Sequence, residues 1–543
     1  MDLSLASISK AIVDIRNDDR SLLVWSSAVV ILLTVCLSLV WLPSRHSTRY
    51  PIVNYKSHAW TYASAKAQFV SNARQLLAEG SRKAGTLLLL TRWLRTDLGV
   101  QFGGPFKIIT ESRPLIILPP EAIDAVNAEK NLSFVEFVRE EHLSNFDTFR
   151  TMRPFPTSMF NEAVLKGITR NLHKFTKPMN MQMTACLNKN WGHQSQWQEV
   201  PVMDNVLDWV TRLSNIVFLG DRFGKNEEWL ELTSSFTVNM FTALAQTKLF
   251  HPLLRPAIDT FAPLNRQVRK QQDAIEAILR PVMDERHEEI RAAKREGRKP
   301  NLPDDSIEWF RNAANGRDYP EVWIQLGLAQ VAIQTTSDQL SQAILNLCLY
   351  PDFVEPLRQE AIEVLRQHGM VKQTLVKLEL LDSYLKESQR LKPVSLASMH
   401  RRAMANVELT GGIRIREGEH LAISNHCMWD EKNYPNPERF DLYRFIERKK
   451  LPGYESRSSF VTTSPDHLGF AHGKYACPGR FLAGNMMKIA LLHLLLKYDM
   501  KIDNPDEAKW WYHGTDINVK MGAKLWMKSR KPEIDLDAMT FEL

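Results

Sequence analysis

The sequence predicts a mainly helical protein with small β-sheets, preceded by one N-terminal transmembrane helix. Three observations predict this class. Long segments repeat their apolar residues with the period of an α-helix, whereas the runs rich in β-branched residues are short and bounded by polar turns. One stretch, residues 22–42, contains no charged residue. No linker rich in Gly, Ser or Pro divides the remainder, so residues 61–543 are predicted to form a single domain.

Residues 22–42, LLVWSSAVVILLTVCLSLVWL, are the predicted membrane anchor. As a helix this stretch would be about 31 Å long, which matches the roughly 30 Å hydrocarbon core of a bilayer. A tryptophan lies near each end, where aromatic rings favour the interface. The alternatives are a buried core helix and a cleaved signal peptide, which would have a shorter apolar region before a small-residue site. We therefore expect a flank at 1–21, the anchor, and a proline-containing hinge at 43–60.

The composition excludes several classes of protein. Of the 543 residues, 44% are hydrophobic and 24% are charged, which excludes a disordered chain. A mean hydropathy of -0.28 excludes a protein with many membrane spans. The net charge is +7, but the basic residues are scattered, and their densest runs, 294–299 and 448–450, lie in polar connecting stretches. This pattern is typical of solvated loops, so we do not expect nucleic-acid binding.

The cysteines are too few for a disulfide scaffold, and none forms a Cys-x-x-Cys pair. This indicates an intracellular chain with reduced thiols, one of which can take part in chemistry. The five are Cys36, Cys186, Cys348, Cys427 and Cys477.

The individual elements follow from local patterns. Residues 106–110 and 114–118 are predicted to form a strand pair around a polar turn, and short β-segments are expected near 407–416 and 517–527. Helices are predicted at 205–219, 227–247, 264–296, 321–349, 353–368, 373–391 and 480–498.

The segment FAHGKYACPGR, residues 470–480, places a cysteine in a loop directly before a long apolar helix. Such a loop can point several backbone N–H groups at the Cys477 sulfur, which stabilises a thiolate and tunes a bound metal. Gly473 and Gly479 would let the backbone approach a flat ligand where a Cβ would clash. Phe470 would form an apolar wall behind the sulfur. Cys477 is therefore the candidate metal ligand.

The pattern F-x-x-G-x-x-x-C-x-G in this segment resembles the haem-ligand loop of the cytochrome P-450 family. The resemblance implies the fold of that family, haem b as cofactor, and Cys477 as the axial thiolate. Tyr475 stands where Arg or His often contacts a haem propionate, and tyrosine can donate a hydrogen bond there but brings no positive charge. Arg401, in the run HRRA, is the remaining candidate for a propionate contact.

A second element, Glu387-Ser388-Gln389-Arg390, lies on a predicted helix upstream of the cysteine. Alone, Glu-x-x-Arg is usually a solvated pair on a helix surface. The family resemblance implies that Glu387 and Arg390 join Arg439, of the run PERF, in a buried ionic cluster. The role of this cluster is structural, because it would hold the cysteine loop in place.

A third element, VAIQTTSD at residues 331–338, lies inside the longest apolar helical pattern. Two β-branched hydroxyl residues and a glutamine violate the local helix preference, and such violations often mark functional sites. The alternative is that the hydroxyl groups bond back to the preceding turn. The resemblance implies that Thr335 takes the place of the threonine associated with oxygen activation. Gln334 stands where an acid is usual, so no carboxylate proton relay is expected there.

The resemblance also implies a reaction and a partner. Thiolate ligation of haem iron favours cleavage of the O–O bond of bound dioxygen, as in monooxygenases. Because the chain carries no Rossmann or flavin fingerprint, NADPH would supply electrons indirectly, through NADPH–cytochrome P-450 reductase. The basic residues Lys474, Arg480 and Lys488 near the loop fit an acidic reductase docking there.

The runs IQTTSD and KYACPGRFLA are similar to members from filamentous-fungal secondary metabolism, which include ent-kaurene and indole-diterpene oxidases. This similarity implies an apolar, terpenoid or indole-derived substrate. It also implies a single-pass protein of the endoplasmic reticulum membrane with a cytosolic catalytic domain, although the basic residues flanking the anchor are evenly divided. Two alternatives stay open: a haem-thiolate isomerase or dehydratase that needs no O2, and a non-catalytic haem- or lipid-binding membrane protein.

Overall fold

The computed structural model describes residues 49–55, 62–92, 104–155 and 157–539. The predicted flank and anchor, with most of the hinge, lie outside these residues, so those boundaries stay predictions. Within the described ranges, no helix combines the length and the apolar character that crossing a bilayer requires.

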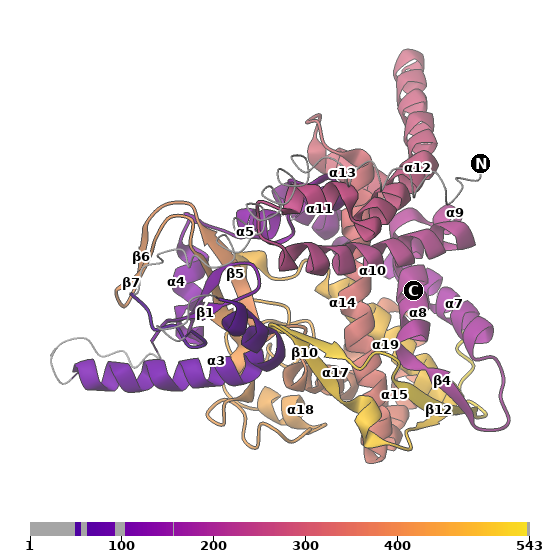
Figure 1. Ribbon diagram of the computed structural model, residues 1–543. Coiled ribbons are helices and arrows are strands. Elements are labelled where there is room, and N and C mark those ends of the chain that lie inside the picture. Colours follow the sequence, from indigo (N-terminus) through magenta and orange to yellow (C-terminus); the bar gives the residue numbers. More distant parts are fainter. Residues whose placement is uncertain (1–48, 56–61, 93–103, 156, 540–543) are drawn as a thin grey trace, which may run out of the picture.

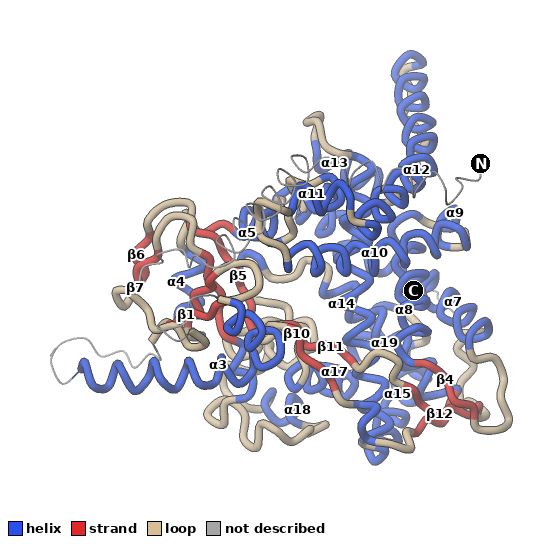
Figure 2. Tube along the Cα trace, in the orientation of Figure 1, coloured by secondary structure: helices blue, strands red, loops and turns tan. Residues whose placement is uncertain are grey.

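Helices make up most of the body, and the largest sheet lies to one side of them (Figures 1 and 2). The α-helices are α3 (Ala63–Arg92), α4 (Ile123–Ala128), α5 (Phe134–Glu141), α6 (Ser158–Ala163), α7 (Leu172–Asn190), α8 (Val202–Leu219), α9 (Asp221–Gly224), α10 (Glu227–Leu249), α11 (Arg255–Phe261), α12 (Pro263–Glu296), α13 (Ser306–Ala314), α14 (Glu321–Leu349), α15 (Val354–His368), α16 (Lys372–Lys377), α17 (Glu379–Leu391), α18 (Arg444–Lys449) and α19 (Arg480–Lys497).

Helix α14 occupies the centre of the helical part (Figure 1). It packs against α8, α10, α17 and α19, and most of its residues are buried on every side. A helix that is apolar all round is expected to lie inside a protein, and this explains why the sequence pattern of 321–349 shows little amphipathic character. The main hydrophobic core surrounds this helix.

The predicted helices are confirmed, with one difference. The segment 373–391 was expected to be continuous, but α16 ends at Lys377 and α17 begins at Glu379. Leu378 between them has φ −77° and ψ 74°, and its side chain is fully buried. The carboxylate of Glu360 accepts hydrogen bonds from the N–H groups of Leu380 and Leu381, which otherwise lack partners at a helix start. A tertiary contact therefore starts a new helix here.

The predicted strand pair is confirmed as β1 and β2, which pair antiparallel at the edge of a five-stranded sheet with the order β1-β2-β8-β5-β3. The segment 407–416 forms the hairpin β6–β7, whereas 517–527 is divided between two other sheets, because β11 pairs with β10 and β12 pairs with β4 and β9. The strands are β1 (Phe106–Ile109), β2 (Pro114–Leu118), β3 (Leu132–Ser133), β4 (Gln198–Pro201), β5 (Ala397–Ala403), β6 (Val407–Leu409), β7 (Ile413–Ile415), β8 (His420–Ser424), β9 (Tyr498–Lys501), β10 (Trp510–His513), β11 (Asp516–Val519) and β12 (Lys524–Ser529).

The five-stranded sheet is buried on both faces. Alternate residues of β2 enter different clusters: Ile116 and Leu118 pack with α4 and the β6–β7 hairpin, and Leu115 and Ile117 pack with α3. Successive side chains of a strand point to opposite faces, so a strand covered on both sides reads as a continuous apolar run. Strand β5 also reaches the segment around the cysteine loop, because Arg401 lies over the Tyr475 ring and Ser398 donates to the Leu468 carbonyl.

Candidate active site

The cysteine loop surrounds one sulfur with hydrogen-bond donors. The N–H of Cys477 donates to the carbonyl of Phe470 at 2.9 Å, which closes the loop before α19 begins at Arg480. Burial raises the pKa of the Cys477 thiol. The N–H of Gly479 and the guanidinium and N–H of Arg480 act in the opposite direction by stabilising the thiolate. This is the arrangement expected of a sulfur that is to be ionised on binding a metal ion, which would supply the missing positive charge.

The two loop glycines have different surroundings. Gly473 has φ +79°, and a Cβ there would lie 2.2 Å from the side-chain nitrogen of Asn127 on α4. A glycine is therefore needed at position 473, because Asn127 occupies the space that a side chain would fill. A Cβ at Gly479 would meet nothing within 4 Å, so the protein itself leaves that side open. The ring of Phe470 is partly buried and lies 5.2 Å from the ring of Phe460, which gives the loop its apolar backing.

The surroundings of Arg401 indicate that the residues of this site fit a haem. Its side chain is 1% exposed, and its guanidinium lies 4.6 Å from the centre of the Tyr475 ring. One nitrogen donates to the carbonyl of His400 at 2.8 Å, whereas Nε and Nη2 are buried without a partner in the described part of the chain. Burial lowers the pKa of Arg401 to about 10, and Tyr475 opposes this. A buried cation with two unused donors requires an anion, and a haem propionate is an anion of suitable chemistry.

Thr335 lies on α14 and is exposed, although the helix around it is largely buried. Its hydroxyl donates to the carbonyl of Val331 at 3.0 Å, so this hydroxyl does bond back to the preceding helical turn, as the alternative interpretation expected. Val331, Ala332 and Gln334 are partly exposed, and the first two border the same core as Phe470. The accessible strip on α14 and the cysteine loop therefore lie at the edge of one hydrophobic core.

The buried ionic cluster is present, but one of its predicted members is wrong. Arg390 donates to Glu387 through Nε at 2.7 Å and Nη2 at 2.9 Å, and Arg444 donates through Nε at 2.9 Å. All three side chains are buried, whereas Arg439 is exposed and contributes only its carbonyl, to Nη2 of Arg444 at 3.0 Å. The chain turns back after Asn436, which has φ +51°, and this turn brings Arg444 rather than Arg439 under α17.

Lys386 is a contact that sequence reasoning missed. Its fully buried ammonium donates to the carbonyls of Arg457, Ser459 and Thr462 at 2.7–2.9 Å. Arg480 joins the same segment to the cysteine loop, because it donates to the carbonyls of Val461 and Cys477 at 2.9 and 2.7 Å. A lysine beside a glutamate on a helix usually reads as a solvated residue, so no sequence signal distinguished it.

The three basic residues proposed for reductase docking differ in their exposure to solvent. Lys474 is exposed, but Lys488 is buried and lies 2.9 Å from Asp382 in an ion pair. The Arg480 guanidinium is engaged by the two carbonyls already named. Of these three residues, Lys474 is exposed, Arg480 is partly exposed and Lys488 is buried, so Lys474 is the best placed to meet a partner.

Comparison with known proteins identifies the family. A family model described as cytochrome P-450 matches residues 101–521. The chain belongs to the cytochrome P-450 family. The cytochrome P-450 monooxygenase adrA of Penicillium rubens is 33% identical over 512 residues, which cover 94% of this chain and 97% of the relative. The monooxygenase hepE of Aspergillus oryzae is 34% identical and covers 89% and 86% of the two chains.

Solved structures support the fold. A cytochrome P-450 haem domain has a TM-score of 0.63 at 16% identity and covers 89% of this chain and 98% of that one. Cyanobacterial CYP120A1 with retinoic acid bound has a TM-score of 0.60 at 18% identity and covers 81% and 96%. The protein is therefore a cytochrome P-450 monooxygenase with a mainly helical fold and small sheets, and its cofactor is a haem ligated by a thiolate.

Proposed function

We propose that this monooxygenase oxidises an apolar, terpenoid or indole-derived intermediate of fungal secondary metabolism, with O2 and with electrons from NADPH–cytochrome P-450 reductase. The observation that supports the catalytic part is the Cys477 loop, in which two backbone N–H groups stabilise one thiolate. The haem would be held by this sulfur, with Arg401 and Tyr475 at a propionate. When bound, it supplies the chemistry that activates dioxygen.

The residues of α14 carry the proposed proton transfer. The accessible Thr335 hydroxyl would hold water on the side of the haem opposite Cys477, and Gln334 would anchor that water through its amide. A glutamine cannot ionise, so it orients water but does not itself supply a proton. The exposed Thr335 also favours a monooxygenase over an isomerase or dehydratase, because those enzymes use no O2 and deliver no proton to bound dioxygen.

Reconstitution with the reductase tests this function. Microsomes that contain both proteins should convert a terpenoid or indole-derived precursor from the producing fungus to a product heavier by one oxygen atom, and only with NADPH and O2. Isotope-labelled dioxygen should place its label in the product. Conversion without NADPH would favour the isomerase or dehydratase, and binding without conversion would favour the non-catalytic alternative.

We further propose that the protein is a single-pass protein of the endoplasmic reticulum membrane with a cytosolic catalytic domain. The predicted anchor supports this, and so does an apolar surface between α10 and α12, where Leu249, Leu253 and Phe261 are about 70% exposed. Deletion of residues 1–42 should leave a haem-binding body that still associates partly with lipid. Protease treatment of sealed microsomes should degrade the catalytic domain; its protection would reverse the orientation.

A further inference from the structure

The polar side chains buried between α8 and α14 are unusual for a hydrophobic core. Helix α14 packs more extensively on α8 than on any other described element. Near the start of α8, the Met203 sulfur lies 3.5 Å from the hydroxyl of Ser341 in the second half of α14. The end of α8 lines the same cavity as residues 301–305, which precede α13. Ser306, the first residue of α13, donates to Gln325 near the start of α14. The two helices are therefore antiparallel.

The register of this pair brings polar residues together. Counting equal numbers of residues from the Met203–Ser341 contact places Ser214 of α8 level with Gln330 of α14, because both helices rise about 1.5 Å per residue. On α14 the residues Gln330, Gln334, Ser337 and Ser341 recur at helical spacing and form one stripe. Ser341 of this stripe contacts the Met203 sulfur, and we call five other buried polar residues of the region the α8–α14 seam: Thr151, Thr211, Ser214, Gln330 and Ser337.

Every member of the seam is at most 1% exposed. Among the residues described by the structure, none of their hydroxyl oxygens and neither amide atom of Gln330 has a hydrogen-bond partner. Thr151 belongs with them because its carbonyl lies 2.8 Å from where a Cβ of Gly327 would be, one helical turn before Gln330. Each unpartnered buried polar group costs about 1–3 kcal/mol, so a set this large requires ligands.

We propose that ordered water molecules occupy the α8–α14 seam and form a proton route from solvent to Gln334 and Thr335. Water is the ligand whose size and donor–acceptor chemistry suit hydroxyl and amide groups without charge, and six polar atoms would support on the order of two waters. At one end of the route, Gln334 lies one turn after Gln330 and directly before the exposed Thr335.

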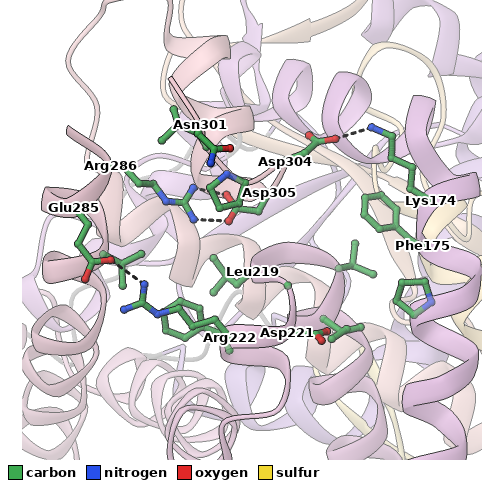
Figure 3. Close-up of a pocket in the computed structure, with 18 of the residues that line it drawn as sticks. Lys174, Phe175, Leu219, Asp221, Arg222, Glu285, Arg286, Asn301, Asp304 and Asp305 are labelled. Atoms are coloured by element: carbon green, nitrogen blue, oxygen red, sulfur yellow. Dashed lines mark hydrogen bonds and ion pairs between the residues drawn. The ribbon is translucent and has the colours of Figure 1, made fainter. Parts of the chain in front are cut away.

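The other end of the route is a cavity of about 600 Å³ between α7, α8, α12 and residues 301–305 (Figure 3). Val217, one turn after Ser214 on α8, lines it. Its rim carries ion pairs of Arg222 with Glu285 and Lys174 with Asp304, whose side chains are about half exposed, so this cavity is open to water. The seam thus lies between a solvent-open cavity and the accessible strip of α14.

The transfer itself needs no additional reactant. A proton from bulk water enters at the cavity, each step breaks one O–H bond and makes another along the waters, and one proton leaves at the Thr335 hydroxyl. The route rests on the proposed role of Thr335, and it explains how a chain with Gln334 in place of an acid supplies protons. Gln330 and Ser214 are positioning residues, because they hold water rather than touch the substrate.

Neutron or high-resolution X-ray diffraction of the wild-type holoenzyme tests the water site without any variant. We expect ordered water within hydrogen-bond distance of the Gln330 amide and the Ser214 hydroxyl. A dry seam, with these groups paired to one another or to backbone, would overturn the proposal. This outcome is independent of whether Thr335 takes part in catalysis.

Matched substitutions test the route. Thr211→Val and Gln330→Leu should lower the ratio of product formed to NADPH consumed, by about tenfold for Gln330→Leu, and leave haem content unchanged. Thr176→Val is the control, because this threonine on α7 is equally buried but its hydroxyl already bonds to the Leu172 carbonyl. Electron density for the seam waters should disappear in Gln330→Leu. Unchanged coupling in both seam variants, with the waters gone, would overturn the route.

Discussion

The two sides of the haem-binding region are held by opposite means. On the loop side, Glu387, Arg390, Arg444 and Lys386 are buried charges, and their donors and acceptors are paired with one another or with backbone carbonyls. On the α14 side, apart from the buried Asp338–Lys392 ion pair, the members of the α8–α14 seam are neutral, and their side-chain polar atoms lack a protein partner in the described ranges. The difference shows which side is a fixed support and which side is built to hold small ligands. A satisfied charged network rigidifies, whereas unpaired neutral groups leave places for water.

The largest effect is expected from breaking the loop-side cluster. Glu387→Ala would leave Arg390 and Arg444 buried without an anion, which should lower the free energy of unfolding by about 3–5 kcal/mol and release haem. Chemical denaturation and haem content measure this. Arg439→Ala is the matched control, because the exposed side chain lies outside the cluster, and it should be within about 0.5 kcal/mol of wild type. Equal effects of the two variants would contradict the assignment of Arg444.

A variant on the α14 side should change catalysis without changing stability. Thr335→Ala should keep haem and substrate-induced spectral changes, but divert NADPH to peroxide and lower product per NADPH by about tenfold or more. Gln334→Leu should impair coupling by removing an anchor for water, whereas Gln334→Glu should leave it unchanged or improve it. Wild-type coupling in Thr335→Ala would remove the proposed role and reopen the isomerase alternative.

Arg401 combines the two features, because it is a buried charge and also has donors without a protein partner in the described residues. Its substitution should therefore have opposite effects on the haem-free and the haem-loaded protein. Without haem, Arg401→Met removes a buried cation with two unused donors, so it should raise the free energy of unfolding by about 1–4 kcal/mol. With haem, the same variant should bind the cofactor more weakly. Denaturation of the haem-free and haem-loaded proteins separates these effects. A variant that destabilises both states equally would contradict the propionate assignment.

The smallest effect concerns pH. Burial lowers the pKa of His493 on α19 to about 3, and its Nε2 lies 2.9 Å from the side-chain oxygen of Asn180. The unfolded chain therefore binds a proton more readily than the folded one between pH 6.5 and about 3, so stability should fall as pH falls through this window. His493→Gln should reduce the slope of unfolding free energy against pH by about one proton. An unchanged slope would show that this histidine does not contribute.

Much of the fold was predictable because it depends on local patterns. The apolar period located the helices, and the two short apolar runs around a polar turn in 106–118 located the strand pair. The break at Leu378 was not predictable, since an apolar residue interrupts the helix without Pro or Gly and the cause is Glu360, which is distant in sequence. The site residues on the loop were readable from one motif. Arg444 and Lys386 were not, because the turn at Asn436 and the carbonyls of 457–462 are brought to them only by tertiary folding.

The central claim is that Cys477 provides the thiolate of a haem, and the carbon monoxide difference spectrum of the reduced protein tests it most directly. Wild type should show the red-shifted Soret band of a thiolate-ligated haem, and Cys477→Ala should lose it. Cys427→Ala is the matched control, because burial raises the pKa of that thiol and it lies in a hydrophobic cluster next to the large sheet. A red-shifted band that survives in Cys477→Ala and disappears in Cys427→Ala would contradict the account.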